Sequence, residues 1–159
     1  IRNIDSFLNE KPSSNISEFS KEFDSVESAK KLALYLFNES LIAFGQDLKN
    51  EHQVMEMLAD IFTDIYSAES AIIRTKKIMD SDNPIPTTKD ISIVFISEMV
   101  GRIITKTHSI LNTLYDGSVS EDIIAKVSKF EKRMRLPVNA VQLKRNIAEY
   151  VFDQKKYPY

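Results

Sequence analysis

Four side chains that can bind a metal ion recur at a spacing of four residues: His52, Glu56, Asp60 and Asp64. This spacing places all of them on one face of a helix. Helical bundles that hold two metal ions combine Glu-x-x-His on two helices with further Glu residues. Here the row holds a single His, and the chain has no Glu-x-x-His. We therefore interpret the row as an acidic face that is solvated or paired with basic residues, and predict no metal site.

Other catalytic patterns are also missing from the sequence. The second His, His108, has no partner or pocket that the sequence could assign to a general base. The chain contains no Cys, so a thiolate nucleophile is excluded. It also lacks the G-x-S-x-G motif and both glycine-rich phosphate-binding motifs. We predict no catalytic, cofactor-binding or metal-binding residue in this chain.

Charge is distributed unevenly along the sequence. The net charge is −2, yet residues 126–156 hold nine Lys or Arg against three Asp or Glu, a local net charge of +6. Six of these side chains form a possible basic surface: Lys129, Lys132, Arg133, Arg135, Lys144 and Arg145. Such a surface can bind an anionic partner or membrane headgroups. We favour a basic helical end that meets the acidic remainder of the bundle or another subunit, because Phe130, Met134 and Ile147 interleave with it as core residues would.

The elements that carry these residues are predicted to be helices. The 159 residues include only three Gly and five Pro, and apolar residues recur with helical periodicity. We expect helices over about 25–44, 51–79, 89–115, 121–135 and 140–152. Short loops between long helices indicate an antiparallel up-and-down bundle of four to five helices. Residues 1–22 are predicted to be a linker or partly ordered segment, and residues 23–159 a single helical-bundle domain.

The second predicted helix has the clearest pattern. Asn50 is its expected N-cap, with Gln53 completing a capping box. Six apolar residues form one stripe along it: Val54, Leu58, Ile61, Ile65, Ala68 and Ile72. Asp24 and Ser120 are the expected caps of the first and fourth helices.

The third predicted helix carries apolar residues on two sides. Ile91, Val94 and Phe95 lie nearly opposite its main apolar stripe, although a helix in a simple bundle needs only one apolar face. Glu98 and Arg102 follow, four residues apart with the acid first, which suits a helix pair. These five residues form a possible docking surface for another domain. A plainly solvated Glu98–Arg102 pair is an equally good interpretation.

Two segments of the sequence resemble the extra C-terminal domain of very-long-chain acyl-CoA dehydrogenases. The first reads E-M-L-A-D-I-x-x-D-I-Y-x-A-E-S-A-I-I-R over residues 56–74. The second is Ile96-Ser97-Glu98-Met99-Val100-Gly101-Arg102-Ile103, which is similar to an I-E-x-x-x-R-I segment two helices later in such proteins. The resemblance covers about residues 29–114. Its motifs are helix-packing patterns, so it implies a fold before it implies chemistry.

The resemblance also implies what the parent protein does. Acyl-CoA dehydrogenases bind FAD and oxidise the Cα–Cβ bond of a fatty acyl-CoA, the first step of fatty acid β-oxidation, with a Glu as catalytic base. Their β-rich middle domain, R-x-x-R-D-x-R segment and catalytic Glu segment have no match here. The chain is therefore expected to be inactive alone. Its expected role is to dock on the catalytic body of the same polypeptide in a homodimer, where it can also contact a membrane peripherally.

The alternative hypothesis is a free-standing helical interaction module that uses residues 126–156 for an anionic partner or membrane surface. Nucleic acid is not an expected partner, because the net charge is −2 and no recognisable module is present. The chain begins Ile1-Arg2-Asn3 without Met, which favours a processed protein or a fragment. A bacterial cytoplasm is the first expectation for its location, and a mitochondrial matrix the second.

Overall fold

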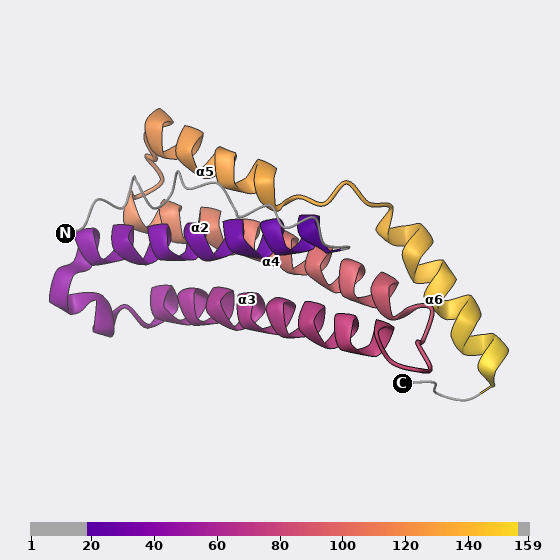
Figure 1. Cartoon of the computed structure of the whole chain (residues 1–159). Helices are drawn as coiled ribbons and strands as arrows, with labels where there is room; N and C mark the ends of the chain where they lie inside the picture. Colours follow the sequence, from indigo (N-terminus) through magenta and orange to yellow (C-terminus); the bar gives the residue numbers. More distant parts are fainter. Residues whose placement is uncertain (1–18, 156–159) are drawn as a thin grey trace.

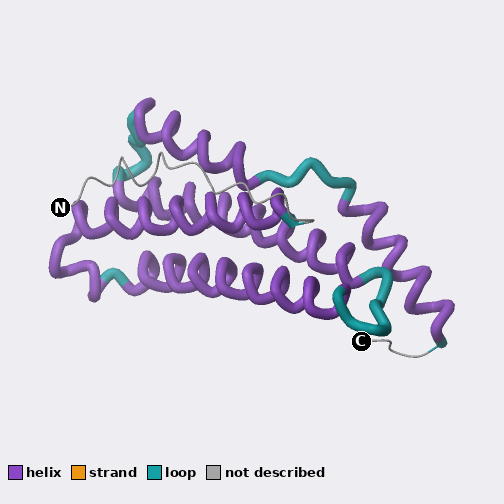
Figure 2. Tube along the Cα trace, viewed as in Figure 1, coloured by secondary structure: helices purple, strands orange, loops and turns teal. Residues whose placement is uncertain are grey.

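The computed structural model describes residues 19–155, which form a bundle of α-helices (Figure 1). Its elements are α2 (Ser20–Phe44), the 3₁₀ helix η1 (Gly45–Asn50), α3 (His52–Met79), α4 (Thr88–Leu114), α5 (Glu121–Met134) and α6 (Ala140–Gln154). Within this described range the chain has helices and loops but no strand (Figure 2). The predicted all-α fold is confirmed.

Four of the helices follow an up-and-down order. α2, α3 and α4 lie side by side, each reversing the direction of the one before it, and α5 runs back along α2 (Figure 1). α6 lies outside this group and packs against α4 (Figure 1). The structure is thus an antiparallel bundle of four helices with a fifth helix added at one end.

The core forms where α2, α3 and α4 face one another. All six residues of the predicted stripe on α3 are buried, and Ile61, Ala68 and Ile72 are completely inaccessible to solvent. The opposing helices contribute further fully buried side chains: Ala29, Leu32, Ala33 and Leu36 from α2, and Ile96, Met99, Ile103 and Ile110 from α4. The helical periodicity of the sequence therefore identified the core face of α3 correctly.

The shorter helix α5 closes the core from one side. Its Val127, Phe130 and Met134 are buried, as their spacing predicted. The hydroxyl of Ser25 in α2 donates a hydrogen bond of 2.6 Å to the backbone carbonyl of Met134, and both residues are inaccessible to solvent. The Ser120 side chain caps α5 by accepting from the backbone N–H of Ile123, which confirms the predicted start of this helix.

The start of α2 differs from the prediction. The helix begins at Ser20, so Asp24 lies inside it and is not its cap. Phe19 is 2% exposed and packs in the core. Because this contact fixes the chain before Asp24, the helix begins earlier than the predicted cap. The predicted linker over residues 1–22 therefore overlaps α2 from Ser20 onward, and residues 1–18 lie outside the described residues.

The connection between α2 and α3 also differs. Asn50 ends η1, which the sequence did not predict, and α3 begins at His52 without a side-chain cap among the described residues. The predicted capping box of Asn50 and Gln53 is therefore wrong. Gly45 turns the chain at a positive φ of 56°, which suits glycine, and Leu48 then enters the core at 4% exposure. Burial of Leu48 explains why a tight 3₁₀ helix replaces the expected cap.

Candidate functional site

The acidic row on α3 meets basic side chains of α4. The Asp60 carboxylate accepts from Lys106 Nζ at 2.7 Å, and the Asp64 carboxylate accepts from Arg102 Nη2 at 2.7 Å. His52 and Glu56, at the beginning of the row, are exposed. Within residues 19–155 no group of three or more His, Asp or Glu is arranged to hold a metal ion. The row thus has the predicted pairing with basic residues at its two Asp positions.

Arg102 holds α3 and α4 together at the middle of the bundle. Besides the Nη2 contact, its Nε donates to both carboxylate oxygens of Asp64 at 3.1 Å. The guanidinium carbon also lies 5.8 Å from the ring centroid of Phe95, within range of a cation–π contact. The hydrogen bonds to Asp64 raise the pKa of Arg102 above its ordinary value. This forked arrangement suits structural pairing, because a guanidinium that stays charged cannot act as a general base.

Glu98 pairs with the last helix. Its carboxylate accepts from Lys144 Nζ of α6 at 2.5 Å, and this hydrogen bond is the main cause that lowers the pKa of Glu98. Glu98 and Arg102 thus form their hydrogen bonds with α6 and α3, while their opposite charges also attract each other within α4. Both side chains are still about half exposed.

The possible docking surface on α4 is partly covered by the chain's own helices. Val94 is 8% exposed, while Ile91 and Phe95 are partly buried. α6 packs against α4, and the Lys144–Glu98 contact places it on the side of α4 that carries these residues. Phe95 packs against the buried core, so one member of the possible docking surface is used within the bundle. Docking through these five residues stays a prediction.

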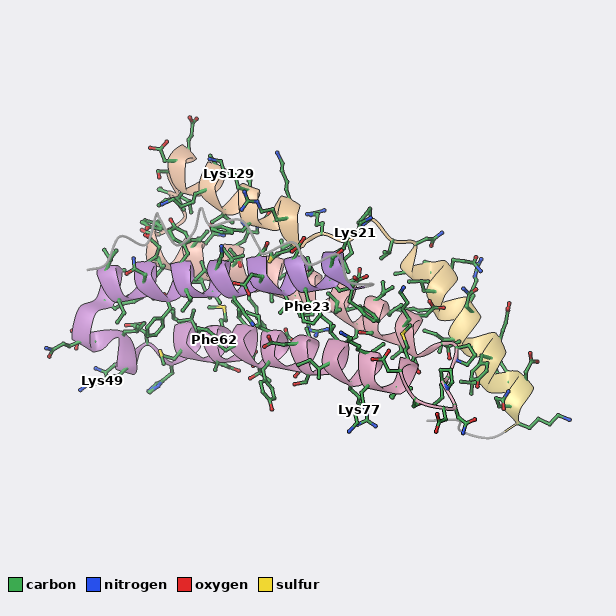
Figure 3. All side chains as sticks on the ribbon, viewed as in Figure 1. Lys21, Phe23, Lys49, Phe62, Lys77 and Lys129 are labelled. Carbon is green, nitrogen blue, oxygen red and sulfur yellow. The ribbon has the colours of Figure 1, made fainter. Side chains whose placement is uncertain are left out.

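His108 and the basic residues lie at separate places on the surface. His108 is half exposed and contacts the Glu131 carboxylate of α5 at 2.9 Å, so it joins two helices. Lys129, Lys132 and Arg133 are exposed on α5, where Figure 3 labels Lys129. Arg145 is exposed on α6, next to Lys144.

The six basic residues do not come together as one surface in the described structure. α5 and α6 extend toward opposite ends of the bundle and are joined by an irregular segment (Figure 1). Lys144 is used in the contact with Glu98, and Arg135 lies beside a cleft on α4. The basic side chains of residues 126–155 are therefore spread over α5, α6 and the segment that joins them.

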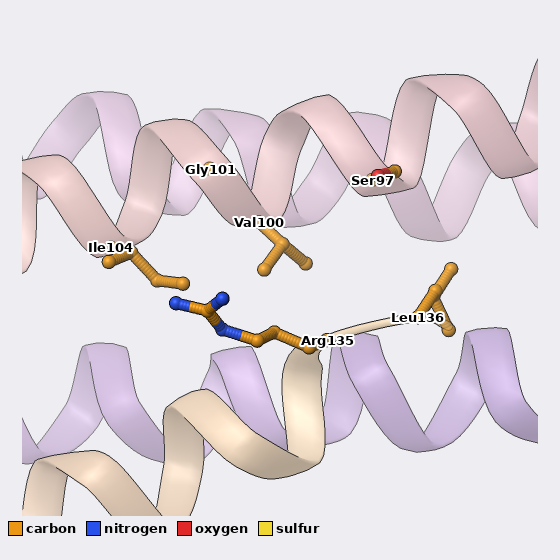
Figure 4. Close-up of a pocket in the computed structure, with 6 residues that line it drawn as sticks. All are labelled: Ser97, Val100, Gly101, Ile104, Arg135 and Leu136. Carbon is orange, nitrogen blue, oxygen red and sulfur yellow. The ribbon is translucent and has the colours of Figure 1, made fainter. Parts of the chain in front are cut away.

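The cleft beside Arg135 has a volume of about 310 Å³ and lies between α4 and the segment that follows α5 (Figure 4). Its lining consists of Ser97, Val100, Gly101, Ile104, Arg135 and Leu136. The Arg135 side chain extends along the cleft toward Ile104 (Figure 4). Ser97 is the one hydroxyl in this lining, and no His or carboxylate accompanies it. The lining offers neither the base that would activate a nucleophile nor a pair of acid and base groups.

Sequence reasoning did not identify this cleft. The Leu136-Pro137 break did predict that the chain leaves the helix there, since the residue before Pro disfavours helical dihedrals. The direction in which Arg135 then points depends on how α5 packs on α2, which no local pattern contains. None of the described helices combines the length and the apolar character that a membrane span requires.

Comparison with known proteins assigns the family. The family model described as "Acyl-CoA dehydrogenase, C-terminal domain" matches residues 28–129. A probable acyl-CoA dehydrogenase of Bacillus subtilis is 25% identical over 150 residues, which is 93% of this chain and 25% of that protein. The chain is also similar in fold to a crystal structure of an acyl-CoA dehydrogenase complexed with FAD from Bacillus anthracis. That comparison has a TM-score of 0.81 and 21% identity, and covers 98% of this chain and 26% of the other.

These comparisons agree with the resemblance found in residues 56–74 and 96–103. The chain spans about a quarter of the length of each relative. Since the family model matches from α2 into α5, well over half of the sequence, the chain belongs to the acyl-CoA dehydrogenase C-terminal domain family.

Proposed function

We propose that this chain is the non-catalytic C-terminal helical domain of an FAD-dependent acyl-CoA dehydrogenase that acts in the first step of fatty acid β-oxidation. Its task is to dock on the catalytic body of the same polypeptide. The observation that carries the proposal is that the side chains capable of acid–base chemistry are used in contacts between helices. Asp60, Asp64 and Glu98 all join one helix to another, while the cleft beside Arg135 contains no acid or base.

A flavin does not fit the cleft beside Arg135. The cleft is formed by the middle of α4, where the backbone N–H groups are used inside the helix and cannot cradle a diphosphate. Its one cationic group is Arg135, and no aromatic side chain lines it. We therefore place FAD in the catalytic body, which is consistent with the FAD present in the Bacillus anthracis relative. No step of the reaction is assigned to this chain.

The same proposal also implies an oligomeric state and a location for the parent protein. We expect a homodimer in which the domain contacts the body near the dimer interface. The named relatives come from two Bacillus species, which supports a bacterial cytoplasm as its location.

The test compares the full-length polypeptide that contains this chain with the 159-residue chain alone. Each is assayed with saturated acyl-CoA substrates and an artificial electron acceptor, and the absorbance of bound flavin is recorded. The full-length protein should bind flavin and reduce the acceptor, whereas the chain alone should do neither. Acyl-CoA-dependent turnover by the chain alone would contradict the non-catalytic role. A full-length protein without flavin would contradict the assignment to a flavoenzyme.

A further inference from the structure

One side of the bundle carries most of the exposed apolar side chains. Seven of the twelve large apolar residues that are exposed within the described range lie on the outer side of α2 and α3. We define this α2–α3 face by Phe23, Leu34 and Leu41 of α2 and Met55, Phe62, Tyr66 and Ile73 of α3. Their exposed fractions range from 37% to 73%. The remaining five are Ile42, elsewhere on α2, and four residues of α5, α6 and the segment between them, so the α2–α3 face holds the largest group of exposed apolar side chains in the described structure.

Helical spacing places each set on one side of its helix. In α2 the steps from Phe23 to Leu34 and Leu41 are eleven and seven residues, which are close to whole numbers of turns. In α3 the steps from Met55 to Phe62, Tyr66 and Ile73 are seven, four and seven. Each set therefore spans about 27 Å along its helix at 1.5 Å per residue.

A contact between the helices shows that the two lines share one face. Lys30 Nζ of α2 lies 2.7 Å from Glu69 Oε1 of α3. Lys30 lies seven residues after Phe23, and Glu69 lies seven after Phe62, so this ion pair bridges the same sides of the two helices. With α2 and α3 antiparallel, Phe23 is level with Ile73 and Leu41 with Met55. Figure 3 shows Phe23 and Phe62 between α2 and α3, with Phe23 nearer the end of the bundle where α2 begins.

We propose that the α2–α3 face is the surface through which this domain packs on the catalytic body. The inference rests on the proposed function and names the contact surface that it requires. Large contiguous apolar patches on a protein surface mark interaction sites, and the apolar centre of an interface supplies most of its energy. Glu69 and Lys30, each about one-third exposed, would fix the register of the contact as they lose water.

The length of the relatives indicates why the body is the occupant. The chain corresponds to about a quarter of each relative, so in the proposed parent three quarters of the polypeptide is tethered to this domain. Tethering through a short linker gives an effective concentration of the order of millimolar. A second copy of the domain is not tethered and would have to compete with the body for this face from bulk solution. Phe23 also lies one turn from the start of α2, where a preceding body would be joined.

The experiment uses hydrogen exchange in the full-length protein. Amides of α2 and α3 should exchange at least tenfold more slowly there than in the 159-residue chain, because docking suppresses local opening. The double variant Leu34→Glu/Phe62→Glu should remove this protection in the full-length protein. The matched control is Ile42→Glu, which changes a residue that is 70% exposed on α2 but lies off the face. It should leave the protection unchanged.

A second measurement excludes unfolding as the cause. Since Leu34 and Phe62 are exposed in the isolated chain, the double variant should keep its helical circular dichroism and its urea midpoint there. If the double variant retains full protection in a flavin-containing, active full-length protein, the face is not the docking site, although the proposed function stands.

A dimer of the isolated chain is a separate outcome. If the double variant dissociates that dimer while the full-length protein is unaffected, a second copy occupies the face and the proposal that the body occupies it is overturned. A full-length protein without flavin or acyl-CoA-dependent activity would overturn the proposed function itself.

Discussion

α3 and α6 are both amphipathic helices, but they belong to the structure in different ways. α3, with 28 residues, buries seven of them and starts without a side-chain cap among the described residues. α6, with 15 residues, is capped by Asn139, whose side chain accepts from the backbone N–H of Gln142 at 3.1 Å, yet within the described structure it buries none. The side-chain cap at the start of α6 therefore did not lead to burial of this helix in the core. Burial against other helices decides which helix forms the stable part of the fold.

The magnitudes of the interactions support this contrast. Burying one Ile or Leu side chain contributes about 1.5–3 kcal/mol, and α3 buries several. An N-cap contributes about 1 kcal/mol, and an exposed ion pair such as Lys144–Glu98 contributes about 0–1 kcal/mol. α6 should accordingly open locally while α2, α3 and α4 stay folded.

The largest effect is expected at the buried stripe of α3. Ile72→Ala should lower the free energy of unfolding by about 2–5 kcal/mol, because Ile72 is fully buried and the surrounding core cannot close around the cavity. Ile73→Ala is the matched control at the next position, where the side chain is 58% exposed, and it should change stability by less than about 0.5 kcal/mol. Urea unfolding followed by circular dichroism measures both. Equal losses at the two positions would show that the core is not where the structure places it.

A smaller and more local effect is expected at α6. Asn139→Ala should cost about 1 kcal/mol of local stability, because the N–H of Gln142 loses its acceptor. Hydrogen exchange should become faster in residues 140–154 and stay unchanged in α3. Ser120→Ala, which removes the cap of α5, provides the comparison. If the Asn139 variant accelerates exchange in α3 as strongly as in α6, the two helices unfold together and the contrast between them is wrong.

Removing the ion pair of α3 should cost more stability than removing the ion pair of α6. Asp64, on α3, has a side chain that is 16% exposed and receives a forked contact from Arg102, whereas Lys144 on α6 is 56% exposed. We expect Asp64→Asn to cost about 1 kcal/mol and Lys144→Met at most a few tenths, since solvent screens the exposed pair. Thermal or urea unfolding of the two variants gives the order. A larger loss for Lys144→Met would reverse the comparison.

The smallest effect is a pH dependence of the α6 contact. The pKa of Glu98 is lowered in the folded protein, so its contribution is present above the ordinary value of 4.5 and is lost as the pH falls through the lowered pKa. Acidification over this range should therefore accelerate hydrogen exchange in α6 more than in α3. Glu98→Gln should remove this extra acceleration, because it no longer titrates. An unchanged pH dependence in that variant would assign the effect to another group.

The sequence predicted the features that depend on local periodicity or a local cap. Val54 to Ile72 were recognised as one buried stripe, and Ser120 was recognised as the cap of α5, because each pattern lies within a few turns of helix. The start of α2 and the helix η1 were missed. They depend on the burial of Phe19 and Leu48 by residues distant in sequence.

The candidate surfaces were harder to predict than the helices. Ile91, Val94 and Phe95 were predicted to form one apolar group apart from the main stripe, but Phe95 packs against the core, and only the structure shows α6 packing against this helix. The α2–α3 face was not recognised, because Phe23, Phe62 and Ile73 become one surface only when α2 and α3 pack in the register that the Lys30–Glu69 contact shows. Relations between helices therefore account for what the sequence did not reveal.

The most direct test of the central claim is to determine the coding sequence upstream of Ile1. If this chain is the appended domain of a flavoenzyme, that sequence should encode a catalytic body with a β-rich middle segment and an R-x-x-R-D-x-R pattern. Its length should approach three quarters of the whole protein, as in the relatives. A start codon directly before Ile1, with no such body encoded, would contradict the claim.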